Sequence, residues 1–171
     1  MSYSIYDGSI VLAQDALSAL SSIITKAEAH ASAADLPAAR LYEDMLPLSF
    51  QVYMVTDAAQ KLAARGTDVA PLDLGRELND FAAMKDRIAQ VQDILAKVDR
   101  AAFEARAEAE VTIGLGVNKE AKMQLKQYVH GYVVPNIFFH TTTAYGILRK
   151  EGVPLGKMDY LSAFIGKFLP Q

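Results

Sequence analysis

The residues best suited to chemistry lie in one apolar, aromatic stretch near the C-terminus, residues 135–152. Asn136 and His140 stand four positions apart in it, so in a helix they share one face. That face is predicted to point inward, because apolar residues recur beside the pair at helical spacing: Val129, Val133, Ile137, Ala144 and Ile147. A buried amide and a buried imidazole need hydrogen-bond partners, water or an ion. The pair therefore marks either a polar network that fixes the core or a ligand site.

Three further residues complete the set of candidates. Asp44 stands at the start of the second predicted helix, where it could cap that helix or face inward at the end of the bundle. Tyr145 lies on a face next to that of His140, so its hydroxyl would have to reach round to join a pocket with Asn136, His140 and Asp44. His30 stands near the end of the first predicted helix, where a partly exposed histidine is favourable. Only tertiary folding could bring His30 to the others.

The composition describes an ordinary globular chain. Its 171 residues suit one domain, 1–171, and 51% of them are hydrophobic. The chain has no cysteine, which excludes disulfides, thiolate metal sites and a cysteine nucleophile. The formal net charge is −3 and basic residues form no cluster. We therefore expect no nucleic-acid partner.

Neither a membrane span nor a signal peptide is expected. No stretch reaches the roughly 18 apolar residues that a span needs. The N-terminus lacks a basic region, and Gln14 and Asp15 interrupt its apolar run. We expect a soluble, cytoplasmic protein that makes no membrane contact.

The apolar pattern predicts the elements that would position these side chains. Helices are predicted near residues 9–31, 42–65, 76–98 and 127–150, because apolar residues in each repeat at alternating spacings of four and three. Such spacing is typical of helices packed against near-parallel neighbours. Alternating apolar residues between 111 and 125 predict a hairpin, and residues 158–168 a short closing helix. The fold is predicted to be all-α, an antiparallel four-helix bundle with a small β-hairpin between the third and fourth helices.

Three residues are predicted to shape the helix ends. Asp44 is a plausible N-cap of the second helix, with Pro47 in its first turn. Gly66 is expected to close that helix just past its last turn. Pro135 lies inside the fourth helix and removes one backbone hydrogen bond, so we expect a bend there.

Several segments resemble a known family. They are Lys26–Ala31, Ala39–Leu48, Pro135–Tyr145 and Ile147–Lys157, which include a Pro-Asn-x-x-x-His motif and an Arg-Leu-x-x-Asp-Met motif. The family is a domain-of-unknown-function branch of the DinB-like (YfiT-like) superfamily of metalloenzymes. The resemblance covers nearly the whole chain. It implies a DinB-like four-helix bundle that is often a dimer.

The resemblance also implies a metal site, from which this sequence departs. Members of the superfamily bind a divalent metal through one histidine on the second helix and a His-x-x-x-His pair on the fourth. His140 matches the second histidine of that pair, and Asn136 occupies the place of the first. The second helix has no histidine; Ser49 and Gln51 lie near the expected position. The metal site is therefore expected to be degenerate, with no cofactor bound.

Three functional hypotheses remain at the level of sequence. The first is a non-catalytic protein, a homodimer that binds a small molecule or another protein. The alternative is a thiol transferase or isomerase dependent on a divalent metal, with Zn or Ni held by His140 together with Asp44 or His30. The third is a metal-free hydrolase or isomerase with His140 as general base, for which a carboxylate partner and a nucleophile motif are missing.

Overall fold

The computed structural model describes residues 4–114, 116–117 and 119–169. The fold is mostly helical with one two-stranded antiparallel sheet. The long helices are α1 (Leu12–Glu28), α2 (Leu48–Thr67), α3 (Phe81–Ala96) and α6 (Val134–Lys150). The shorter elements are α4 (Arg100–Ala105), β1 (Glu110–Gly114), β2 (Glu120–Gln124), α5 (Leu125–Tyr128) and α7 (Lys157–Ile165).

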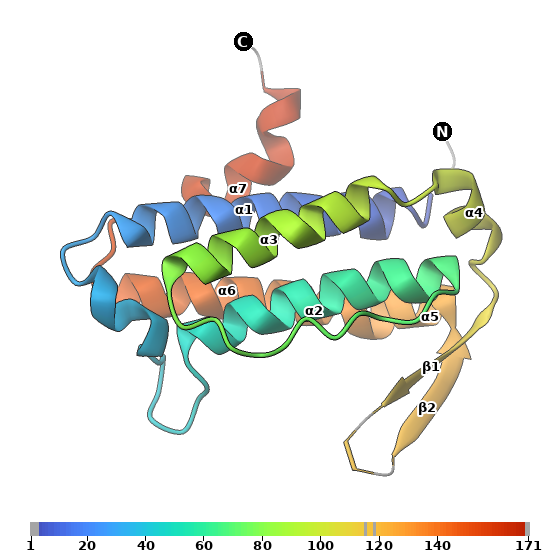
Figure 1. The fold of residues 1–171 in the computed structure, drawn as a ribbon. Coiled ribbons are helices and arrows are strands. Elements are labelled where there is room, and N and C mark those ends of the chain that lie inside the picture. Colours follow the sequence, from blue (N-terminus) through green and yellow to red (C-terminus); the bar gives the residue numbers. More distant parts are fainter. Residues whose placement is uncertain (1–3, 115, 118, 170–171) are drawn as a thin grey trace.

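The four long helices pack side by side around one apolar core. α2 packs against both α3 and α6, and α1 packs against the same two helices (Figure 1). The predicted apolar stripes point into this core: Leu17, Leu20, Val52, Leu62, Met84 and Ile147 are among its fully buried residues. α7 lies across α1, where Lys26 pairs with Asp159 and Lys167 pairs with Asp15 at 3.0 Å. The predicted closing helix is thus confirmed.

The direction of the helices departs from simple alternation. The connection 68–80 runs back along the length of the fold, so α2 and α3 run in the same direction (Figure 1). Gln60 anchors this connection to α2, because its side chain makes two hydrogen bonds of 3.1 Å with the backbone of Leu72. The predicted antiparallel relation applies to α1 against α3 and to α2 against α6, but not to α2 against α3.

The second helix begins later than predicted. Pro47 is its N-cap, with φ −71° and ψ 175°, and no side chain caps it. The prediction of Asp44 as the N-cap is wrong: Asp44 is exposed in the preceding loop. Proline disfavours helical backbone in the residue before it, so the helix cannot extend back through Leu46. The loop is closed instead by the Leu48 N–H, which donates to the Ala39 carbonyl at 2.9 Å.

Gly66 has a different role from the predicted one. α2 continues to Thr67, and Asp68 takes the left-handed conformation at φ 61° that ends it. Gly66 stays inside the helix, where a Cβ atom would lie 2.0 Å from Cε2 of Phe103. The buried Phe103 ring comes from α4, a helix that the sequence pattern did not predict. Gly66 is therefore needed for a close approach between α2 and α4.

The hairpin is confirmed, with Val111 opposite Met123 in its register. The third helix begins at Phe81 rather than near residue 76, because Asp80 caps it by accepting a hydrogen bond from Ala83 N–H at 2.8 Å. The first helix ends before His30, which lies in the turn that follows.

The fourth predicted helix is one helical run from Leu125 to Lys150 with an irregular turn. Residues Val129–Val133 form a π-helical turn between α5 and α6, just before Pro135. Proline has no N–H to donate to the preceding turn, and its ring crowds the carbonyl four residues back. A widened turn accommodates both effects. The sequence predicted a bend at Pro135, and the helix is instead irregular in the turn just before it, at Val129–Val133.

One helical run, Asp7–Glu28, is long and apolar enough to cross a membrane by length and composition alone. Its apolar residues form part of the core, where Leu17, Leu20 and Ile24 are fully buried. Packing inside the fold therefore accounts for its hydropathy.

Candidate functional site

The central feature is a hydrogen bond between α2 and α6. Gln51 Oε1 lies 2.7 Å from His140 Nδ1, and Gln51 is only 3% exposed. The amino group of Gln51 donates to the Leu46 carbonyl at 2.8 Å, which fixes the orientation of the amide. Its oxygen therefore faces the imidazole, so the Nδ1 atom of His140 must carry the proton. The neutral ring then keeps a free lone pair on Nε2.

The surroundings of His140 favour this neutral form. The rings of Phe50 and Phe139 meet it edge to face, with centroids 6.2 Å and 5.1 Å away. Burial lowers the pKa of His140 below its ordinary value, because the charged form loses hydration there. Phe139 is 60% exposed, so this layer of the fold lies close to solvent. His140 is half-buried and partnered, as an acceptor or base at Nε2 would need to be.

Asn136 does not join His140. No hydrogen bond connects the two side chains in the described part of the chain, and both lie at the edge of the buried stripe rather than on it. Ile137 and Thr141, 1% and 0% exposed, are the buried α6 positions next to them. Thr141 satisfies its hydroxyl by donating to the Ile137 carbonyl at 2.8 Å. The expected Asn136–His140 network is thus replaced by a pairing across two helices.

The other predicted site residues lie apart from this pair. Asp44 is exposed and makes no hydrogen bond or ion pair with any described residue. His30 Nδ1 lies 2.9 Å from the Ser32 hydroxyl, just after α1. Tyr145 lines a hollow of about 180 Å³ between α6 and α7, together with Tyr160. The residues expected to share one pocket are therefore distributed over separate parts of the surface.

The side chains present do not fit the three-histidine metal site that the resemblance implies. Among the described residues, no three His, Cys, Asp or Glu side chains come together as a metal site would require. Gln51 and His140 are hydrogen-bonded to each other, and Asn136 supplies only a neutral amide. Zinc sites are built from thiolate, imidazole and carboxylate ligands. The predicted set of His140, Asp44 and His30 is not assembled either.

A small cavity continues the line of the Gln51–His140 pair along the groove between α2 and α6. It has a volume of about 190 Å³ and is lined by polar residues that include Asp57, Lys61, Arg65, Tyr128 and Asn136. Asn136 lines it, and the Oδ1 atom of this residue is buried without a hydrogen-bond partner. A buried unpaired amide oxygen is uncommon in folded proteins and marks a position of interest.

The charged groups of this cavity are held in place. Arg65 donates from Nη1 to the Tyr128 hydroxyl at 3.0 Å and from Nε to the Thr112 carbonyl at 3.2 Å. Lys61 pairs with Asp57 at 2.6 Å. Burial raises the pKa of Tyr128 to about 12 despite the adjacent guanidinium. The residue pattern did not predict this group, although Tyr128, Tyr132 and Asn136 recur at intervals of four.

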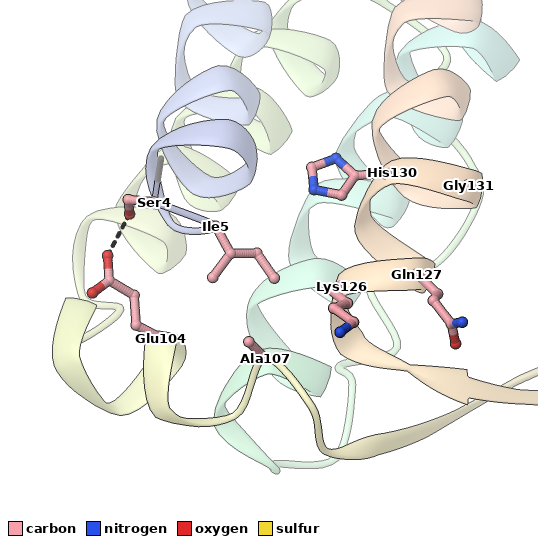
Figure 2. Close-up of a pocket in the computed structure, with 8 residues that line it drawn as sticks. All are labelled: Ser4, Ile5, Glu104, Ala107, Lys126, Gln127, His130 and Gly131. Atoms are coloured by element: carbon pink, nitrogen blue, oxygen red, sulfur yellow. Dashed lines mark hydrogen bonds between the residues drawn. The ribbon is translucent and has the colours of Figure 1, made fainter. Parts of the chain in front are cut away.

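A larger hollow of about 800 Å³ opens where the start of the chain meets α4 and α5 (Figure 2). His130 points into it, opposite Ser4 and Glu104, which hydrogen-bond to each other (Figure 2). Ser4, which lines the hollow, is the first described residue. The groove between α2 and α6, which holds the Gln51–His140 pair, is the candidate site.

Comparisons with known proteins agree with this architecture. The family described as Domain of unknown function (DUF1993) matches residues 5–161. The chain belongs to this family. A solved structure of a DinB family member protein from Shewanella denitrificans is also similar to this DUF1993 protein, with 32% sequence identity and a TM-score of 0.82. The match covers 92% of this chain and 91% of that one. No curated protein matches it. The DUF1993 chain is thus a DinB-like domain of unknown function, as the sequence resemblance predicted.

Proposed function

We propose that this protein is a non-catalytic binding protein for a small molecule, with a degenerate metal position. The observation that carries the proposal is the 2.7 Å contact between Gln51 Oε1 and His140 Nδ1. Where related metal sites would gather imidazoles, this chain has a neutral amide that bonds the remaining imidazole. Such a pair fixes two helices against each other and assembles no ligand set for an ion.

We also infer that the four long helices form the DinB-like four-helix bundle. The contacts of α2 and α1 with both α3 and α6 support this arrangement, as does the likeness to the DinB family member from Shewanella denitrificans. The protein is proposed to be one domain over residues 1–171, cytoplasmic and homodimeric. The exposed apolar side chains of Tyr42, Leu46 and Phe139 are candidates for the contact between two copies.

The alternative is a thiol transferase or isomerase that uses a divalent metal such as Zn or Ni. One observation favours it: His140 has its Nδ1 atom fixed by an oxygen acceptor and its Nε2 lone pair free, as metal-binding histidines usually do. A metal on His140 would still need further ligands. Among the described residues, the His30 ring bonds Ser32 and Asp44 is exposed, and neither side chain bonds the Gln51–His140 pair.

Metal analysis of protein made without an affinity tag separates the two functions. We expect zinc and nickel well below one equivalent, even from medium supplemented with either metal, and a melting temperature that does not respond to EDTA. His30→Asn serves as the control for His140→Asn, because it removes an imidazole outside the pair. A stoichiometric metal that is lost in His140→Asn but kept in His30→Asn would overturn the proposal in favour of the alternative.

A further inference from the structure

The groove between α2 and α6 carries a run of facing residues beyond the Gln51–His140 pair. On one side, residues at helical spacing on α2 line it: Met54, Asp57, Ala58, Lys61 and Arg65. On the other side stand Tyr128, Tyr132 and Asn136, and β1 closes the end with Ile113. The cavity is thus built by three separate parts of the chain, and its two rows of side chains are continuous with the pair.

Hydrogen-bond donors outnumber acceptors in this cavity. Within the described chain, the Nη2 atom of Arg65 has no hydrogen-bond partner, and the Tyr128 hydroxyl accepts from Arg65 without donating its own proton. Two cationic side chains face one carboxylate, Asp57, which already pairs with Lys61. The excess of donors and positive charge suits an acceptor-rich ligand with negative charge.

Asn136, whose amide is not fully hydrogen-bonded, also lines this cavity. Its Oδ1 atom is buried without a partner, whereas its Nδ2 atom is not buried and makes no hydrogen bond within the described chain, so Nδ2 is a further donor at this cavity. The π-helical turn Val129–Val133 lies between Tyr128 and Asn136. Turns of this kind are rare and are frequent at functional sites, because they re-aim the side chains around them.

We propose that this cavity binds a small carboxylate with a short apolar body. The carboxylate meets the guanidinium fork of Arg65 and the hydroxyl of Tyr128, while the body packs against Met54 and Ile113. A volume of about 190 Å³ limits the ligand to a few carbons or one ring, below the usual size of drug-like ligands. The inference rests on the proposed binding function and supplies its site and ligand class.

Calorimetric titration with simple carboxylates tests the ligand class. Acetate, butyrate and benzoate are compared at constant ionic strength with their neutral amides, acetamide, butyramide and benzamide. We expect butyrate or benzoate to saturate one site per chain at millimolar concentration or below, with the matching amide at least tenfold weaker. Failure of all three carboxylates to bind, or equal binding of acids and amides, would overturn the proposal.

Variants locate the site. Arg65→Lys keeps the charge but loses the planar fork, and Asn136→Asp adds a negative charge with almost no change in shape. Each should weaken carboxylate binding at least tenfold. Lys85→Met is the control, since Lys85 pairs with Glu28 at 2.7 Å on an exposed surface away from the cavity. Circular dichroism confirms that the variants fold. Unchanged binding in both folded cavity variants would refute the assignment.

Each titration is run both with EDTA and with one equivalent of zinc. A metal found at His140 would defeat the proposed metal-independent function but leave the carboxylate titration unaffected. Loss of carboxylate binding in Asn136→Asp, with no metal bound in either protein, would support both inferences. The two can therefore fail separately.

Discussion

Replacing His140 with alanine is the sharpest test of the pairing between α2 and α6. The change removes one neutral hydrogen bond, worth about 0.5–1.5 kcal/mol. Because the Oε1 atom of Gln51, a residue 3% exposed, then stays buried without its partner, the larger cost of about 1–3 kcal/mol applies in place of that net value. The half-buried ring leaves only a partial cavity, because solvent can enter beside Phe139. We expect the free energy of unfolding to fall by about 1–3 kcal/mol at neutral pH.

The same substitution should change how stability depends on pH. Burial lowers the pKa of His140 in the folded state, so the unfolded chain binds a proton more readily. The stability from the neutral ring is complete above the unfolded pKa of about 6.5 and is lost as the pH falls below it. In His140→Ala this loss disappears. The difference in unfolding free energy between wild type and variant should therefore shrink from pH 7.5 to pH 5. These two pH values lie on either side of the unfolded pKa, each on the order of one unit from it.

Urea unfolding at several pH values, followed by circular dichroism, measures both effects. Gln51→Leu and the double variant complete a cycle, in which we expect a coupling of about 1 kcal/mol between the two side chains. His30→Ala is the matched control, because the His30 ring bonds only Ser32 among the described residues, in the turn after α1. A coupling near zero, or a difference between wild type and His140→Ala that grows as the pH falls, would refute the pairing.

Three further predictions concern the fold and its charges. Gly66→Ala should lower the free energy of unfolding by about 1–3 kcal/mol, because the new Cβ would lie 2.0 Å from the Phe103 ring. Gly146→Ala is the control: its Cβ would lie 3.7 Å from its nearest neighbour, so the change should be neutral or stabilising. Equal effects of the two changes in chemical denaturation would contradict the packing of α2 against α4. Burial should move the ultraviolet absorbance step of the Tyr128 phenol to about pH 12, and that step should be missing from Tyr128→Phe. A difference between wild type and variant near the ordinary value of about 10 would contradict the burial. With a net charge of −3, the protein should not bind duplex DNA at physiological salt, and salt-sensitive micromolar binding in an anisotropy titration would contradict this.

The core could be predicted from sequence because helical spacing specifies which face is apolar. The helix predicted near residues 9–31 repeats its apolar residues at helical spacing, and Leu17, Leu20 and Ile24 at that spacing are all fully buried. Helix ends were less predictable, because each depends on which one of several neighbouring residues caps the helix or takes the left-handed conformation that ends it. Pro47 excludes the start proposed at Asp44, and Asp68 rather than Gly66 takes the left-handed conformation.

The site could be predicted only in part. Spacing placed Asn136 and His140 on one face of α6, but the partner of His140 is Gln51 on α2, which spacing within α6 does not reveal. Gln51 was recognised as lying near the missing histidine, yet its bond to His140 depends on how α2 packs against α6. The cavity at Arg65 and Tyr128 needs the hairpin and the π-helical turn, neither of which marks a site by its residue types.

Nitrogen NMR of the His140 ring, recorded during a zinc titration, tests whether His140 pairs with Gln51 independently of any metal. We predict a neutral ring with its proton on Nδ1, bonded to Gln51, and no saturable change in the Nε2 resonance at one equivalent of zinc. Gln51→Leu, which removes the acceptor, should release the proton to exchange between the two nitrogens. A one-equivalent shift of the Nε2 resonance, or a wild-type ring protonated at Nε2, would contradict the metal-independent pairing of α2 and α6.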